Sequence, residues 1–109
     1  MGISAFQKTG NTVVFLADTT APTPVQAIST TLGGNQYRIL NSGTVTVFIG
    51  YGTNAATASA IATVVTTSAE AIPLLPGTDE ILTFQPNAFF TGITASGNAN
   101  VYITPGDGL

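Results

Sequence analysis

Short runs of Val, Ile, Thr, Phe and Tyr recur along the chain, separated by Gly, Asn and Pro. This spacing is typical of an all-β protein. We expect strands over residues 3–8, 12–17, 25–30, 36–40, 44–51, 71–75, 81–85, 89–95 and 100–104. The pattern therefore predicts a single compact antiparallel β-sandwich or jelly-roll-like barrel with hairpin connections, and alternation alone does not choose between sandwich and barrel.

The segments between these runs contain residues that tolerate a positive φ angle. Thr-Gly-Asn-Thr (9–12), Gly-Gly-Asn (33–35), Asn-Ser-Gly (41–43) and Ser-Gly-Asn (96–98) predict tight hairpins. Leu-Pro-Gly-Thr (75–78) predicts a type II turn, in which Pro76 fixes φ and Gly77 takes the left-handed conformation. We therefore expect most neighbouring strands to be antiparallel.

Residues 52–69 break the strand pattern, because alanine favours a helix there while the many threonines oppose it. A long loop with a short helix or an irregular strand is the expectation. The preceding Gly-Tyr-Gly-Thr-Asn-Ala (50–55) fits a dinucleotide-binding fingerprint, and Glu70 lies near the position of a ribose-binding acid. No parallel βαβ unit is expected around it, so we interpret the glycines as ending a strand at a bulge or loop.

Alternate residues of a strand point to opposite faces of its sheet. One face of residues 44–51 is expected to carry Val45, Val47, Ile49 and Tyr51, and the other face Thr44, Thr46 and Phe48. Adjacent apolar pairs, among them Val13 with Val14, Phe15 with Leu16 and Phe89 with Phe90, place one apolar side chain on each face. In so small a domain we expect a neighbouring subunit to cover one face of these strands. Along residues 44–51 the uncharged face of Thr44, Thr46 and Phe48 suits that neighbour, which leaves Val47 and Ile49 facing inward.

The chain carries few charges, which strengthens this expectation. It has 2 basic and 5 acidic residues in 109, or 6% charged, against about 25% in ordinary soluble domains. Such a surface costs little to desolvate in a protein interface. The net charge of −3 argues against nucleic-acid and anionic-membrane partners, which need clusters of Lys and Arg. No stretch of about 20 predominantly apolar residues predicts a membrane span.

The residues needed for familiar catalysis are missing from the sequence. There is no cysteine and no histidine, which excludes disulfides, thiolate nucleophiles and imidazole bases. Asp79 and Glu80 would point to opposite faces of a strand, unlike a glycosidase pair, and are interpreted as solubilising charges. Asp107 alone falls short of a calcium loop. We therefore expect one domain, 1–109, that is not an enzyme and binds no cofactor and no metal.

Several short patterns together resemble the small β-rich decoration or cement proteins that tailed bacteriophages place on their capsids. They are N-S-G-x-V-x-V from residue 41, L-P-G from residue 75 and G-x-x-x-V-Y-I-T-P-G from residue 97. The resemblance implies a structural subunit, made in the host cytoplasm without an export signal and located on the outer capsid surface. It would form a trimer or another small homo-oligomer and bind the major capsid protein, so that the shell is stabilised.

Interface residues are expected among the aromatic side chains, because nine are more than so small a core can hold, and among the few charges. The candidates are Phe6, Phe48, Phe90, Asp79, Glu80, Arg38 and Tyr102. Extended arms over 1–8 and 104–109 are expected to clasp a neighbour. Two alternatives stay open: another phage structural component, such as a head fibre base, neck or tail protein, and a carbohydrate-binding β-sandwich module.

Overall fold

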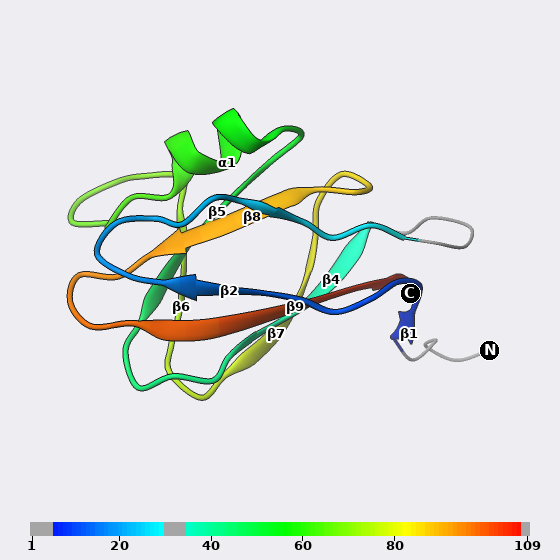
Figure 1. The fold of residues 1–109 in the computed structure, drawn as a ribbon, viewed down its shortest axis with the longest axis horizontal. Helices are drawn as coiled ribbons and strands as arrows, with labels where there is room; N and C mark the ends of the chain where they lie inside the picture. Colours follow the sequence, from blue (N-terminus) through cyan, green and yellow to red (C-terminus); the bar gives the residue numbers. More distant parts are fainter. Residues whose placement is uncertain (1–5, 30–34, 108–109) are drawn as a thin grey trace.

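The computed structural model describes residues 6–29 and 35–107. In this part of the chain the elements are β1 (Gln7–Lys8), β2 (Val13–Ala17), β3 (Val25–Gln26), β4 (Gln36–Asn41), β5 (Val47–Gly52), α1 (Ala55–Ile61), β6 (Ile72–Leu74), β7 (Asp79–Thr83), β8 (Phe89–Ile93) and β9 (Ala99–Asp107). Two antiparallel sheets pack face to face, as Figure 1 shows. The predicted β-sandwich is confirmed, and each of the nine expected strands has a counterpart.

The two sheets are both built around long-range strand pairs. The five-stranded sheet has the order β1-β9-β4-β7, with β2 also paired to β9. Since Gly106 of β9 pairs with Lys8 on one side and Gln36 on the other, β1 and β2 occupy successive stretches of the same edge of β9. The four-stranded sheet has the order β3-β8-β5-β6. Both sheets are open, so the arrangement is a sandwich and not a closed barrel.

The strand pairs follow a simple rule, because β2 pairs with β9, β3 with β8, β4 with β7 and β5 with β6. The chain is thus one long antiparallel ribbon whose tip lies between β5 and β6. Curling the ribbon brings β4 beside β9 and β5 beside β8, which joins the pairs into two sheets. This is the strand arrangement of a jelly roll.

The jelly-roll arrangement corrects the prediction of hairpins. Residues 41–43 and 96–98 carry the chain from one sheet to the other, and residues 9–12 connect β1 to β2 along β9. Of residues 33–35, only Asn35 lies within the described part. The turn at 75–78 is confirmed: Gly77 has φ 72°, and the Thr78 N–H donates to the Leu75 carbonyl oxygen at 3.3 Å. It too crosses between the sheets, from β6 to β7.

The core lies between the two sheets and is formed by the inward residues of each strand. Its members are Phe15, Ala17, Ala27, Tyr37, Ile39, Val47, Ile49, Leu74, Ala88, Phe90, Ala99, Val101 and Ile103. Val47 and Ile49 point inward as predicted, with 0% and 1% exposure. Alternation along β4 and β9 is equally clear, since every second residue is buried as far as Ile103. The period-2 pattern of the sequence therefore produces the packing of the sandwich.

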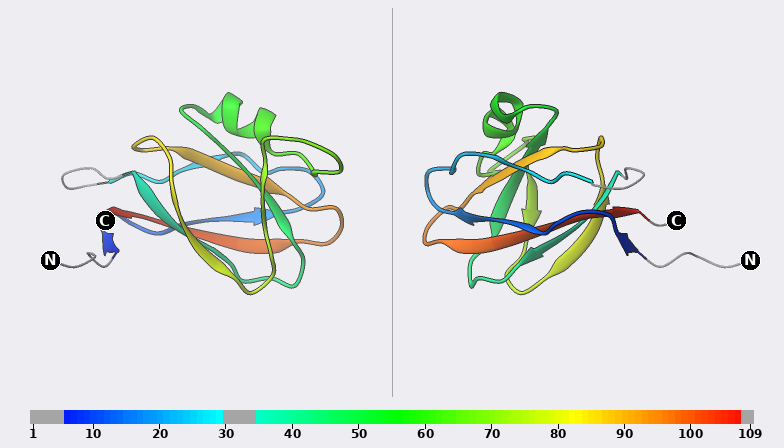
Figure 2. Two further views of the ribbon diagram at one scale, coloured as in Figure 1. Left: turned by 180° about the vertical axis from the view of Figure 1, so that it is seen from behind. Right: turned by 45° about the vertical axis from the view of Figure 1, so that its right-hand side comes forward.

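Helix α1 packs on the outward side of the four-stranded sheet, above β5 and β8 (Figures 1 and 2). Its first turn is capped by Asn54, whose Oδ1 accepts a hydrogen bond from the Thr57 N–H at 2.9 Å. A Cβ at Gly52 would lie 2.7 Å from the Thr57 side chain, and one at Gly50 would lie 2.7 Å from the Ala62 Cβ. The two glycines thus make room for the helix.

This packing explains the motif at 50–55 without a nucleotide. Gly52 ends β5 as expected, but Gly50 lies inside the strand at neither a bulge nor a loop. The short helix that was one expectation for residues 52–69 is confirmed. Because β5 and β6 are antiparallel, the strand-helix-strand unit is not the parallel crossover of a dinucleotide-binding fold.

The ends of the described chain lie against each other and not in extended arms. Strand β9 continues through residues 104–107, which corrects the expected arm there. On the other side, Gln7 pairs with Asp107 and Lys8 with Gly106. The rest of both expected arms, residues 1–5 and 108–109, lies outside the described residues. At seven residues, the helix in the described part is too short to cross a bilayer.

Candidate interaction surface

The outward sides of the two sheets differ in what covers them. Helix α1 lies over the four-stranded sheet, whereas no helix or strand in residues 6–29 and 35–107 lies over the five-stranded sheet (Figures 1 and 2). We call the outward side of β2, β9, β4 and β7 the outer face. Its residues are Val14, Leu16, Gln36, Arg38, Leu40, Asp79, Ile81, Thr83, Asn100, Tyr102 and Thr104.

Large apolar side chains occupy the middle of the outer face. Val14 pairs with Tyr102, and Tyr102 pairs with Leu40, so that three apolar side chains form one row across β2, β9 and β4. Exposure reaches 46% at Val14, 48% at Leu16, 50% at Ile81 and 37% at Tyr102. Directly opposite side chains in adjacent antiparallel strands touch one another. The face therefore presents a continuous apolar strip to solvent.

The polar groups of the outer face are paired within it. Arg38 donates from Nη2 to Asp79 Oδ2 at 2.7 Å. Beside them, the Thr12 and Thr104 hydroxyl groups are hydrogen bonded at 2.7 Å. Strands β2, β9, β4 and β7 contribute one positive and one negative charge to the outer face, and Lys8 of β1 lies on the same side of the sheet because it is paired with Gly106. Opposite charges that are already paired cost less to desolvate than the same charges without partners.

Four of the seven interface candidates lie on or beside the outer face. Arg38, Asp79 and Tyr102 belong to it by strand register. The ring of Phe6 occupies the place that a side chain at Gly106 would need, at the end of β9. Strand alternation predicted a face for a neighbouring subunit along residues 44–51, whereas the sheet side that no described helix or strand covers belongs to the five-stranded sheet.

The other three candidates lie elsewhere. Phe90 is fully buried and packs edge-on against Tyr37 and Phe84, with ring centroids 5.0 and 5.4 Å apart. An interface role for its side chain is therefore wrong, because the core already surrounds it. Phe48 is half-buried on the outward side of β5, in the opposite sheet. Glu80 lies on the inward side of β7 by register and lines the groove at the edge of the sandwich, where its side chain stays exposed.

The aliphatic residues of the outer face were not among the candidates. Val14, Leu16, Leu40 and Ile81 each stand next to an inward apolar residue in the sequence. The adjacent apolar pairs were the signal for them. Sequence alone could not say which member of a pair would be outward, because that depends on the register of the sheet.

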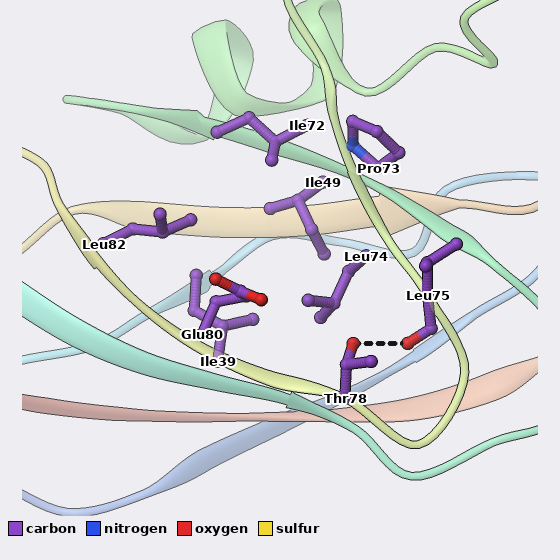
Figure 3. Close-up of a pocket in the computed structure, with 9 residues that line it drawn as sticks. All are labelled: Ile39, Ile49, Ile72, Pro73, Leu74, Leu75, Thr78, Glu80 and Leu82. Atoms are coloured by element: carbon purple, nitrogen blue, oxygen red, sulfur yellow. Dashed lines mark hydrogen bonds between the residues drawn. The ribbon is translucent and has the colours of Figure 1, made fainter.

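A groove opens between β6 and β7, the edge strands of the two sheets, and we call it the edge groove (Figure 3). Its volume is about 230 Å³. It is lined by Ile39, Ile49, Ile72, Pro73, Leu74, Leu75, Thr78, Glu80 and Leu82. The 75–78 turn closes one end, where the Thr78 hydroxyl donates to the Leu75 carbonyl oxygen at 2.6 Å. Glu80 supplies the one charge in this apolar lining.

Metal-ligating side chains do not cluster on either surface within the described residues. Within the described ranges, no three Asp, Glu, His or Cys side chains gather so that they could hold a metal ion. Jelly rolls occur in viral capsid proteins, lectins and cupins, so the fold by itself does not identify a function. Comparisons of the chain with protein-family models, with curated proteins and with solved structures gave no match.

Proposed function

We propose that the protein is a non-catalytic structural subunit that associates with copies of itself and decorates the outside of a viral protein shell. One observation carries the proposal. The outer face exposes Val14, Leu16, Ile81 and Tyr102 around the Arg38–Asp79 ion pair, while α1 lies over β5 and β8 on the opposite side of the sandwich. Apolar clusters exposed on one side of a soluble domain mark interaction sites.

The size of the outer face fits a role that depends on many copies. Four strands about 4.8 Å apart and about five residues of roughly 3.3 Å each give a footprint on the order of 300 Å². One partner in a standard interface contributes about 800 Å². A single contact through this face is therefore weak. An oligomer that engages several lattice sites at once multiplies such contacts by avidity.

The paired polar groups favour a protein as the partner. Arg38 and Asp79 neutralise each other, and the threonine hydroxyl groups at the edge of the face can exchange hydrogen bonds with a backbone or side chain. The described face offers no cluster of cations for a phosphate backbone. A protein lattice with an apolar, weakly charged exterior matches this chemistry.

The first experiment measures self-association. Sedimentation and light scattering of the purified protein are expected to show a trimer or another small homo-oligomer. Tyr102→Asp places a charge in the centre of the outer face and is expected to shift the equilibrium towards monomer. Ser59→Asp is the matched control, because it adds the same charge on the exposed side of α1.

The second experiment measures shell binding. Expanded heads of the virus whose genome encodes the chain, prepared without the protein, are mixed with wild type, Tyr102→Asp and Ser59→Asp. Bound copies are then counted by cryo-electron microscopy. Symmetric, saturable binding by wild type and Ser59→Asp supports the proposal. A monomer that binds no heads overturns it, and retention of that monomer on a polysaccharide column favours a carbohydrate-binding module.

A further inference from the structure

We infer that the edge groove is a second binding site, which takes the aliphatic stem and charged end of a lysine or arginine side chain from a partner protein. Glu80 would be the counter-ion. This site lies between β6 and β7, on a different side of the sandwich from the outer face, and it does not depend on the proposed function.

The groove combines an apolar floor with one carboxylate. Ile39 and Ile49, from opposite sheets, are buried core residues that form its floor, as Figure 3 shows. Leu82 and Ile72 line the two sides. The Glu80 side chain lies over this apolar floor, next to Ile39, with which it is paired in register. A long side chain with an apolar stem and a cationic tip matches this arrangement.

No described residue neutralises Glu80. The ion pair seen in residues 6–29 and 35–107 joins Arg38 to Asp79. Asp79 adjoins Glu80 but points to the other face of β7, so this guanidinium lies on the outer face. The other basic residue of the chain, Lys8, is on β1, and β9 and β4 lie between β1 and β7. Three strand spacings are roughly 14 Å, beyond the reach of direct pairing.

Size and charge both select this occupant. The volume of about 230 Å³ is below the range of roughly 300 to 1,000 Å³ that accommodates cofactors and drug-sized ligands. It suits one long side chain. The chain as a whole has a charge of −3, and so a basic side chain on a partner is attracted both by Glu80 and by the overall field.

An inward charge on an edge strand also has a protective effect. It opposes pairing with a further strand and so limits aggregation of β7. Protection of the edge predicts that removal of the charge promotes aggregation and leaves ligand binding unchanged. Counter-ion function predicts loss of cation binding. The two effects can therefore be measured separately on one variant.

The test titrates the full chain with n-hexylammonium, which models a lysine side chain, and with n-hexanol and hexanoate as uncharged and anionic analogues. NMR chemical shifts of the Ile39, Ile49 and Leu82 methyl groups report on the groove. We expect hexylammonium to bind best. Glu80→Gln should weaken hexylammonium binding by about three- to tenfold. This loss lies between the effects expected for an exposed and for a partly desolvated ion pair. Glu70→Gln, which removes the same charge outside the groove, should leave hexylammonium binding unchanged.

Hexylammonium binding that is preferred over hexanol and lost selectively in Glu80→Gln supports the site. Equal binding of amine and alcohol, an unchanged affinity in Glu80→Gln, or no shift of the groove methyl groups overturns it. Because these readouts do not involve the outer face, a protein that fails to self-associate or to bind heads can still pass this test. Failure of the groove site likewise leaves the proposed function standing.

Discussion

The guanidinium group of Arg38 and the carboxylate of Asp79 form a 2.7 Å ion pair between β4 and β7 on the outer face. Their side chains remain 52% and 43% exposed, and so the pair contributes at most about 1 kcal/mol to folding. A partner that covers the face would desolvate both charges, and loss of one would then leave the other unpaired. Asp79→Asn is therefore expected to lower the free energy of unfolding by less than about 1 kcal/mol but to weaken self-association by about tenfold.

Urea unfolding measures the first quantity and sedimentation equilibrium the second. Glu70→Gln is the control, because it removes one acidic charge from an exposed position outside the outer face. An equal loss of association in both variants would show that net charge, and not the position of Asp79, controls the oligomer.

A second prediction concerns Tyr37, whose hydroxyl group is buried in the core. It donates to the Gln85 carbonyl oxygen at 2.6 Å and accepts from the Ala88 N–H at 3.1 Å, which joins β4 to the segment between β7 and β8. Tyr37→Phe leaves both backbone groups without this partner, so we expect a loss of about 1 to 3 kcal/mol in the free energy of unfolding. Tyr102→Phe, at an exposed hydroxyl group, should change it by less than about 0.5 kcal/mol. Chemical denaturation of the two variants compares them.

The same tyrosine predicts a loss of stability at alkaline pH. Burial raises the pKa of Tyr37 above its ordinary value of 10.0, and hydrogen bonding with the backbone of Ala88 and Asn87 partly opposes the rise. The unfolded chain therefore releases this proton at lower pH than the folded chain. The contribution of the protonated Tyr37 hydroxyl group to the free energy of unfolding is fully present below pH 10.0. It is lost as the pH rises through the folded-state pKa of Tyr37. Tyr37→Phe should show a smaller decrease in unfolding free energy over that range than wild type.

Strand positions were predictable from the sequence, whereas the path of the chain was not. Alternation along β4 and β9 marks the inward residues directly. The Gly- and Asn-containing segments predicted tight hairpins. The same residue types, however, suit both a hairpin within one sheet and a connection from one sheet to the other. At 41–43 the Asn41 side chain is fully buried and accepts from the Gly43 N–H at 3.0 Å. Long-range pairing, which local sequence does not contain, decides the topology.

The sequence predicted that an apolar sheet face would be available for an interface, but it identified only some of the residues on that face. For the adjacent pair Phe89 and Phe90, alternation places one side chain in the core, and the sheet register makes it Phe90. Strand β7 begins at Asp79, two residues before the predicted start. Asp79 and Glu80 point to opposite faces of this edge strand, as alternation predicted, although the strand was expected to begin after them.

A fourth prediction concerns Asn41, which connects the two sheets. Its Nδ2 donates to the Val45 carbonyl oxygen at 2.9 Å and to the Leu74 carbonyl oxygen, on β6 in the other sheet, at 3.0 Å. Asn41→Ala leaves these buried groups unpaired and creates a small cavity, and we expect it to destabilise the fold by about 2 to 4 kcal/mol. The exposed Asn98→Ala is the control in thermal and urea unfolding. Near-equal stability of the two variants would contradict a connecting role for Asn41.

The contact between β5 and α1 gives a fifth prediction, because it depends on the missing side chain of Gly50. A Cβ there would collide with the Ala58 carbonyl oxygen and lie 2.7 Å from the Ala62 backbone nitrogen. These are backbone atoms, so Gly50→Ala must push α1 away from the sheet, and we expect a cost of about 1 to 3 kcal/mol. Faster proteolysis within residues 53–70 should accompany it, whereas the exposed control Thr53→Ala should behave like wild type. Wild-type stability and wild-type resistance to proteolysis in Gly50→Ala would contradict close packing as the reason for the glycine. The helix would then pack less tightly on the four-stranded sheet than the structure shows.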